Sequence, residues 1–408
     1  MRADVAAGQS FTDEVVAASS GTFDRWLLGR IRQPLETAPL RFRLWDGYEL
    51  SPPTDPPVAT IEIKNRRALI GWARDPELNF GEAYMFGAVE VHGDLEGMLE
   101  AVYRSYGPST RRPWWQRHMP HTVEASRQNV HHHYDLGNDF YKLWLDEQML
   151  YTCAYFPTPD ATLEAAQIAK MDLVCRKIRL RPGERVIEAG CGWGALALHM
   201  ARHYGVLVQA FNLSTNQIAY ARERAAREGL SDRVEFVEDD YRNVSGTFDA
   251  FVSVGMLEHV GLENYGDLGR VIDRTMGADG RGLLHFIGRN RPEPLNAWIV
   301  RRIFPGAYPP TLREVCAGVL EPQMLSVLDV ENLRLHYAKT IEHWRHRFEA
   351  SADSVREMAD EQFERAWRLY LAGSQAAFAT GSMQLFQIVF ARGGTNSIPW
   401  TRVEGVTA

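Results

Sequence analysis

The residues best suited to chemistry lie in the stretch RVIEAGCGWGALALH at 185–199, which reads as a strand, a glycine turn and the start of a helix. Before the turn, Val186 and Ile187 are β-branched and apolar, as in a buried parallel strand. Glycine lets the backbone turn tightly and approach a ligand closely, and the turn contains Gly190, Gly192 and Gly194. The stretch therefore predicts a cradle for a nucleotide-type cofactor.

The spacing of these glycines distinguishes between nucleotide cofactors. A dinucleotide site has the pattern G-x-G-x-x-G and an acidic residue about 20 positions later. This chain has G-x-G-x-G, and its next predicted strand, 206–211, runs into Asn212. A cofactor with a single ribose and no phosphates needs backbone approach and polar contacts, but no anion-binding helix N-terminus. S-adenosylmethionine meets these conditions, and the alternative is a tight turn in another kind of α/β protein.

The segments around the turn alternate between expected strands and helices. Strands are expected at 206–211, 234–237, 248–254 and 282–287, and helices at 163–177, 214–228 and 268–276. This alternation predicts a parallel sheet that is covered by helices on both faces. Ligands bind at the carboxyl ends of such strands, which here are 188–194, Asn212, 239–241, 256–261 and 285–288.

The remaining segments predict the domain organisation. Residues 1–21 are expected to be poorly ordered, 22–107 to form a small α+β docking module, and 108–132 to form a linker. The catalytic domain is expected at 133–408. Within it, the segment at about 290–380 is aromatic, helix-rich and basic, and its place before the last strand is that of a lid over the catalytic face.

Composition excludes several classes of function. The 408-residue chain has a formal net charge of −7, which disfavours nonspecific nucleic-acid binding. Its four cysteines have no C-x-x-C spacing, and the consecutive histidines at 131–133 point in different directions, so no metal site is expected. The scattered cysteines and the absence of a long apolar run predict a cytoplasmic protein that meets a membrane only at its surface.

Two clusters combine cations with aromatic side chains, the combination found at lipid interfaces. We expect them to contact anionic lipid. Their residues are Arg111, Arg112, Trp114, Trp115, Trp298, Arg301, Arg302 and Phe304. The alternative for Trp114 and Trp115 is packing between domains.

Eight motifs, in order along the chain, resemble the cyclopropane-fatty-acyl-phospholipid synthases and the related mycolic acid methyltransferases. The motifs are HYDLGND (133–139), YTCAY (151–155), EAGCGWG (188–194), LSTNQ (213–217), DYR (240–242), SVGMLEHVG (253–261), LHFIG (284–288) and HY (336–337). The module before residue 107 also resembles the N-terminal domain of the full-length bacterial synthases. The resemblance implies an α/β, Rossmann-like class I S-adenosylmethionine-dependent methyltransferase, with a seven-stranded sheet and a final antiparallel strand at 385–390.

The resemblance also implies the reaction: methylene transfer from S-adenosylmethionine to the cis double bond of an unsaturated acyl chain of a membrane phospholipid. The alkene attacks the sulfonium methyl, and the resulting carbocation loses a proton as the cyclopropane ring closes. Such a site needs aromatic faces, exclusion of water and a base. The aromatic candidates, which can alternatively pack in the core, are Tyr134, Tyr151, Tyr155, Tyr241, Phe286 and Tyr337.

The family's site residues map onto this sequence motif by motif. The base of the family is a bound bicarbonate, and its ligands correspond to Cys153, Glu258, His285, the backbone amide of Ile287, and Tyr337. The cofactor-binding positions correspond to Tyr134, Thr152, Gly190, Gly192, Gln217, Asp240 and Tyr241. Asn212 and Asp239 depart from the family's pattern, and Cys191 in the turn is expected to be structural.

Three alternatives remain open. Proton loss without ring closure gives a methylene-branched chain, which a partner reductase would convert to a methyl branch. A protein of another class, a lipid-binding protein without activity, would have no need of Glu258, His285 and Tyr337 together. A methyltransferase for a small molecule is disfavoured by the lid and the N-terminal module. The resemblance further implies a homodimer. The clusters of cations and aromatic side chains predict association with the inner face of the membrane.

Overall fold

The computed structural model describes residues 19–105 and 137–399, and the chain divides into two compact units. The described part of the first unit comprises 19–105, 295–305 and 344–382, and that of the second comprises 137–294, 306–343 and 383–399. The expected linker at 108–132 and nearly all of the segment 1–21 lie outside the described residues, as does Tyr134. The domain boundaries expected from the sequence stay a prediction.

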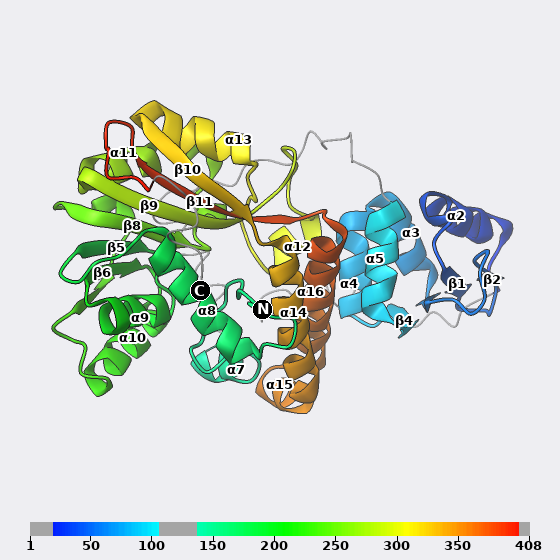
Figure 1. The fold of residues 1–408 in the computed structure, drawn as a ribbon. Helices are drawn as coiled ribbons and strands as arrows, with labels where there is room; N and C mark the ends of the chain where they lie inside the picture. Colours follow the sequence, from blue (N-terminus) through cyan, green and yellow to red (C-terminus); the bar gives the residue numbers. More distant parts are fainter. Residues whose placement is uncertain (1–18, 106–136, 400–408) are drawn as a thin grey trace. The chain divides into compact units, whose positions relative to one another are not determined.

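The second unit is built on a seven-stranded sheet with the order β10-β11-β9-β8-β5-β6-β7 (Figure 1). From β9 to β7 neighbouring strands run parallel, whereas β11 runs antiparallel to both β9 and β10. This confirms the expected α/β fold with a final antiparallel strand. The strands are β5 Arg185–Ala189, β6 Leu207–Asn212, β7 Val234–Glu238, β8 Phe248–Val254, β9 Met276–Gly288, β10 Leu325–Asn332 and β11 Gln384–Arg392.

Strand β10 differs from the sequence-based expectation, which placed 325–332 within a helix-rich insertion. Only its first residue, Leu325, is buried, and the other seven are exposed or half-buried. An edge strand of this kind needs no continuous apolar run. Its sequence, LSVLDVEN, therefore carries little of the hydrophobic signal that identified the central strands.

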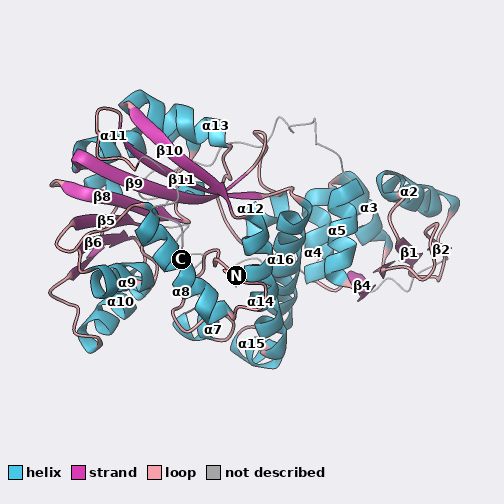
Figure 2. Ribbon diagram, viewed as in Figure 1, coloured by secondary structure: helices cyan, strands magenta, loops and turns pink. Residues whose placement is uncertain are grey.

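Helices cover both faces of this sheet, as Figure 2 shows. Alternate residues of β5 face opposite sides: Val186 packs in one apolar cluster with α8, α9 and α10, and Ile187 packs in another with α11. This alternation is the period of a strand that is buried on both faces. The helices of the unit are α7 Asn138–Lys142, α8 Leu163–Lys177, α9 Ala195–Tyr204, α10 Thr215–Arg227, α11 Tyr265–Thr275 and α13 Leu312–Val315.

The first unit contains a four-stranded sheet of order β2-β1-β3-β4 and a set of helices. Its strands are β1 Leu40–Leu44, β2 Glu49–Leu50, β3 Ala59–Ile63 and β4 Val89–Gly93. Its helices are α2 Thr22–Arg32, α3 Arg66–Arg74, α4 Pro76–Met85, α5 Leu95–Ser105, α12 Ala297–Arg302, α15 Ala352–Met358 and α16 Glu361–Thr380. Helix α14, Arg334–Ala350, begins in the second unit and ends in the first. No helix in the described parts of the chain is both long enough and apolar enough to span a bilayer.

Helices from the insertion pack directly on the N-terminal helices of this unit. Helix α16 packs against α5 and α4, and α12 packs against α4. The contact between α12 and α4 requires Gly81, because a Cβ at this position would lie 2.4 Å from the Trp298 ring. Trp298 is only 3% exposed. The indole that the sequence assigned to a lipid contact therefore fills the space beside a glycine, and this assignment is wrong.

A buried ion pair joins the same two helices. The guanidinium of Arg302 donates to both carboxylate oxygens of Glu82, with Nε–Oε1 and Nη2–Oε2 distances of 2.7 and 2.6 Å. Their side chains are 7% and 4% exposed. The expected lipid contact of Arg302 is therefore also wrong, because its charge is used inside the protein. Arg301, the residue before Arg302, is exposed.

Replacing Arg302 with methionine should destabilise the protein by about 3–5 kcal/mol, because it leaves the buried Glu82 carboxylate without its partner. Urea denaturation followed by tryptophan fluorescence measures the change. Arg301→Met is the matched control and should change stability by less than about 1 kcal/mol. The double variant Glu82→Met/Arg302→Met should recover most of the loss. Equal stability of Arg302→Met and Arg301→Met would contradict a stabilising ion pair between Arg302 and Glu82.

Candidate active site

The glycine turn between β5 and α9 adopts a backbone that suits a ligand. Gly190, Gly192 and Gly194 all have positive φ angles, of 85°, 52° and 84°. A Cβ on Gly190 would lie 2.9 Å from Met256, and one on Gly194 would lie 2.6 Å from Phe236, so packing requires glycine at both. A Cβ on Gly192 would meet no atom within 4 Å. The turn thus leaves open space beside Gly192, as a bound S-adenosylmethionine would require.

Asn212 ties the glycine turn to the neighbouring strand end. Its Nδ2 donates to the carbonyl of Gly192 at 3.2 Å and to Oε1 of Gln217 at 2.7 Å. The side-chain oxygen of Ser214 caps α10 by accepting a hydrogen bond from the backbone N–H of Gln217. Gly192 and Gln217, two of the predicted cofactor residues, are therefore connected through an asparagine that departs from the family's pattern.

At the end of β7, the predicted cofactor residues are already engaged with protein groups. Both carboxylate oxygens of Asp240 accept from the Arg242 guanidinium, at 2.7 and 2.8 Å. Tyr241 lies in the apolar cluster beneath the sheet. Asp239 accepts from the side-chain amide of Asn243 at 2.9 Å. The cofactor roles of Asp240 and Tyr241 stay predictions.

Two predicted catalytic residues, Cys153 and Tyr337, contact the main chain of Leu333, which precedes α14, and a third, Ile287, pairs with a residue that Leu333 binds. The Leu333 N–H donates to the carbonyl of Leu385, the cross-strand partner of Ile287, at 2.9 Å. Its carbonyl accepts from the Tyr337 N–H at 3.1 Å and lies 3.9 Å from the Cys153 Sγ. The main chain of Leu333 thus links the loop at 151–155 and α14 to β11, the neighbour of β9.

Glu258 joins this group through Ile287. It lies in the short helix Leu257–His259 that follows β8, and its Oε1 accepts from the Ile287 N–H at 2.5 Å. The amide that was expected to hold bicarbonate therefore donates to Glu258. The other oxygen, Oε2, is buried and has no hydrogen-bond partner among the described residues. Burial raises the pKa of Glu258 to about 7.

His285 lies two residues before Ile287 on β9 and is 2% exposed. Burial, together with the nearby Lys170 and Lys177, lowers the pKa of His285 well below its usual value, so the imidazole is neutral. Its Nε2 is buried and has no hydrogen-bond partner among the described residues. Glu258 and His285 therefore each present an unsatisfied polar atom, as do several other buried side chains, and these two are distinguished by their places near Ile287.

The Cys153 thiol is fully buried, and burial raises its pKa far above the ordinary range. A thiol that stays protonated is a weak hydrogen-bond donor and a poor nucleophile. Cys153 is therefore unsuited to covalent catalysis, and its thiol donates to the carbonyl oxygen of Ala154, 3.1 Å away. Cys191 in the glycine turn is buried in the same way.

Lys170 is a buried cation that the sequence did not single out. It lies on α8, and its Nζ donates to Oγ1 of Thr152, a predicted cofactor residue, at 2.7 Å. Burial lowers the pKa of Lys170 to about 8, and the carboxyl groups of Asp146 and Glu188 oppose this shift. One signal in the sequence could have identified Lys170. It lies among the apolar positions of the segment 163–177, and a lysine on a buried face is rarely found without a partner.

The predicted aromatic residues divide into two groups. Phe286 is fully buried and packs against Phe386 in the core. Tyr151 is half-buried and lies against Tyr141 and Trp144, with ring centroids 5.7 and 5.1 Å away. A second half-buried ring, that of Tyr155, stacks on His336 at 4.8 Å. Tyr151 and Tyr155 therefore remain candidates for a cation-stabilising wall, whereas Phe286 packs in the core.

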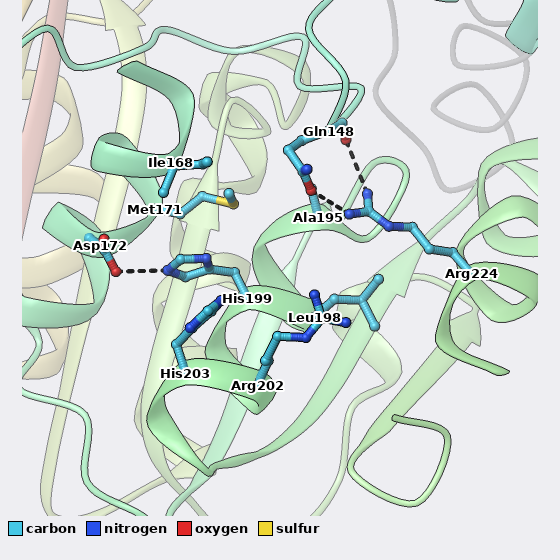
Figure 3. Close-up of a pocket in the computed structure, with 10 residues that line it drawn as sticks. All are labelled: Gln148, Ile168, Met171, Asp172, Ala195, Leu198, His199, Arg202, His203 and Arg224. Atoms are coloured by element: carbon cyan, nitrogen blue, oxygen red, sulfur yellow. Dashed lines mark hydrogen bonds and ion pairs between the residues drawn. The ribbon is translucent and has the colours of Figure 1, made fainter. Parts of the chain in front are cut away.

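A separate cavity of about 290 Å³ lies among α8, α9 and α10 (Figure 3). Nε2 of His199 lies 2.8 Å from Oδ1 of Asp172 on one side of it, and Arg224 reaches Gln148 on the other. None of the predicted site residues lines this cavity. It is formed by helices and not by strand ends, so we do not assign it to the cofactor.

Comparison with known proteins identifies the family. Residues 121–388 match the family described as mycolic acid cyclopropane synthetase, and residues 30–112 match one described as a domain of unknown function, DUF7884. The chain is 38% identical over 390 residues to a probable fatty acid methyltransferase of Pseudomonas putida, covering 89% of this chain and 95% of the relative. It is 35% identical over 354 residues to the cyclopropane-fatty-acyl-phospholipid synthase of Escherichia coli K12, covering 83% and 90%.

A solved structure supports the same assignment. The mycolic acid cyclopropane synthase CmaA1, in complex with S-adenosylhomocysteine (SAH) and CTAB, is 31% identical, with a TM-score of 0.62. The match covers 65% of this chain and 98% of CmaA1. Together with the glycine turn and the strand order, these matches show that the chain belongs to the mycolic acid cyclopropane synthetase family of S-adenosylmethionine-dependent methyltransferases.

Proposed function

We propose that the protein transfers a methylene group from S-adenosylmethionine to the cis double bond of an unsaturated acyl chain of a membrane phospholipid, forming a cyclopropane ring, with bound bicarbonate as the base. The observation that carries this proposal is the pair of buried, unsatisfied atoms, Glu258 Oε2 and His285 Nε2. Glu258 accepts from the Ile287 N–H, and His285 lies two residues before Ile287 on β9. Leu333, which contacts Cys153 and Tyr337, donates to the cross-strand partner of Ile287.

S-adenosylmethionine, when bound, supplies an electron-poor sulfonium methyl group to the alkene. The residues of this chain provide the surroundings that the reaction needs. The Gly192 turn leaves room for the cofactor, and the buried Cys153, Glu258 and His285 keep water from a carbocation. Their polar atoms hold a small anion that takes up the proton released from the transferred carbon.

An anion is stable beside Glu258 only when this residue is protonated, because two negative charges repel each other in a dry site. The pKa of Glu258, raised by burial to about 7, makes the protonated form accessible near neutral pH. In that form Oε2 carries a proton and can donate to the anion, while Oε1 continues to accept from the Ile287 N–H. The neutral thiol of Cys153 has one S–H, which donates to the anion only if it leaves the carbonyl oxygen of Ala154.

Incubation with S-adenosylmethionine and vesicles of an unsaturated phosphatidylglycerol should add one carbon and two hydrogens to the acyl chains, as mass spectrometry would show. Removal of bicarbonate should lower the rate. Proton NMR of the product then separates a cyclopropane ring from a methylene branch. Unchanged acyl masses, with cofactor binding confirmed by calorimetry, would overturn the proposal.

Bicarbonate activation should weaken as the pH rises through about 7, because ionised Glu258 repels the anion. The apparent activation constant should rise by up to about tenfold per pH unit above the pKa. Steady-state rates at fixed calculated bicarbonate concentrations measure it. Glu258→Gln keeps a donor and cannot ionise, so this variant should lose most of the pH dependence. If the activation constant depended on pH equally in the unmodified protein and in Glu258→Gln, this role of Glu258 would be excluded.

The methylene-branched product is a second candidate. The observation in its favour is the 38% identity to a relative that is named a probable fatty acid methyltransferase. The same carbocation would then lose its proton without ring closure, and a partner reductase would complete the methyl branch. A lipid-binding protein without activity would have no use for the unsatisfied donors and acceptors of a buried anion site.

We also propose that an exposed aromatic surface on the first unit contacts anionic phospholipid. Phe23 and Trp26 on α2 are 52% and 58% exposed, with ring centroids 5.9 Å apart. Helix α3 packs beside α2 and exposes Ile70. Large apolar side chains surrounded by cations are typical of surfaces that lie in a bilayer interface. The exposed arginines of these two helices are Arg25, Arg30, Arg66 and Arg67.

Phe23→Ser/Trp26→Ser should weaken binding to vesicles that contain anionic phosphatidylglycerol by about tenfold or more, because it removes the apolar side chains that would enter the interface. Vesicle flotation measures the bound fraction. Met358→Ser, a substitution of another exposed apolar residue of the first unit, is the control and should bind as the unmodified protein does. Equal flotation of both variants would exclude this surface.

A further inference from the structure

A row of three polar residues crosses the sheet beside the anion site. Glu331 on β10 is the cross-strand partner of Gln387 on β11, and Gln387 is in turn the partner of His285 on β9. Residues in register on neighbouring strands project to the same face of the sheet. Lys177, in the last turn of α8, packs on that face with its side chain 2% exposed.

These four side chains form one chain of hydrogen bonds. Nζ of Lys177 donates to Oε2 of Glu331 at 2.5 Å and to Oε1 of Gln387 at 2.7 Å. Nε2 of Gln387 lies 2.9 Å from Nδ1 of His285. Gln387 is fully buried, so water cannot replace either of its contacts. The segment LFQIVF at 385–390 is apolar apart from Gln387, and both ends of the Gln387 amide make hydrogen bonds.

The chemistry of the four groups fixes the direction of every bond in the chain. A lysine ammonium has donors and no acceptor, so the Gln387 atom that faces Lys177 must be the carbonyl oxygen. The amide NH₂ therefore faces His285 and donates to Nδ1. A nitrogen that accepts a hydrogen bond carries a lone pair, and the neutral imidazole must then carry its proton on Nε2.

We propose that Gln387 and Lys177 are positioning residues that hold His285 in the tautomer with the proton on Nε2, so that this N–H donates to the anion in the active site. The proposal rests on the proposed function for the identity of the anion as bicarbonate. Nε2 of His285 is the atom that has no partner among the described residues. In the opposite tautomer its lone pair would face the anion, which would lose a donor and be repelled.

Metal-bound histidines are oriented in a similar way, because a hydrogen bond at the ring nitrogen that does not bind the metal fixes the tautomer. Here the orienting group is the uncharged side-chain amide of Gln387, and the hydrogen bond from Lys177 prevents this amide from rotating by 180°. Glu331 and Asp329, with Nζ–O distances of 2.5 and 3.8 Å, stabilise the charge of that lysine. The lysine therefore fixes the donor direction at the buried ring, and the two carboxylates stabilise the charge of the lysine.

The substitution Gln387→Glu tests the proposal, because a carboxylate still accepts from Lys177 but has no N–H to donate to His285. Nitrogen-15 NMR of protein labelled in histidine reads the tautomer directly, with the His285 signals identified by their loss in His285→Gln. At about pH 8.5, above the ordinary histidine pKa, the unmodified protein should show a protonated Nε2. Gln387→Glu should move the proton to Nδ1, whereas the control Glu331→Gln should keep the original pattern.

Kinetics provides the functional measurement. Gln387→Glu should weaken bicarbonate activation by about tenfold to a hundredfold, because a donor to the anion is lost, while the dissociation constant for S-adenosylmethionine stays unchanged. If Gln387→Glu does not fold, Lys177→Met provides the test, and His285 should then show both tautomers because the amide is free to rotate. A protonated Nε2 alone in every folded variant would overturn the proposal. Tautomer changes as expected in a protein without methylene transfer would leave the positioning role standing and overturn only the proposed function.

Discussion

The removal of ionisable groups from water at the carboxyl ends of the strands is the constraint on which this structure depends. Lys170, Glu188, Glu258 and His285 are all at most 6% exposed. An unpaired charge costs several kcal/mol in such surroundings, so each group must be neutral, or share its charge with a partner. Glu258 and His285 move toward their neutral forms, and Lys170 lies among carboxyl groups. A dry site is also what a carbocation requires, so stability and chemistry impose the same condition.

The sequence predicted the parts of the site that are local. The glycine turn follows from three glycines behind a β-branched strand, and the turn has the expected positive φ angles. The central strands were predictable because strands buried on both faces are continuous apolar runs. Resemblance to a family then supplied Cys153, Glu258, His285 and Tyr337, and the structure brings their segments together. Their individual roles stay predictions.

What the sequence could not show depends on contacts between distant residues. The burial of Trp298 depends on a missing side chain at Gly81, and the charge of Arg302 is used by Glu82, more than 200 positions away. Strand β10 is half-exposed and lacks an apolar run. That Gln387 contacts His285 could not be predicted from the sequence, because it depends on the pairing of β11 with β9. Composition alone places an arginine–tryptophan cluster at a membrane as readily as in a core, because both environments accept an amphipathic side chain.

The junction at Leu333 has a consequence for how this protein can vary. Its links to Leu385 and Tyr337 use only main-chain atoms, and the Cys153 thiol approaches its carbonyl oxygen. Side-chain exchanges at position 333 leave those atoms in place, so an alanine scan would report only the lost packing of the buried Leu333 side chain and not its main-chain bonds. Proline, which has no N–H, is the natural residue that would delete the bond to Leu385. An amide-to-ester replacement at Leu333, introduced by chemical synthesis or codon reassignment, would remove that single donor while leaving the side chain unchanged.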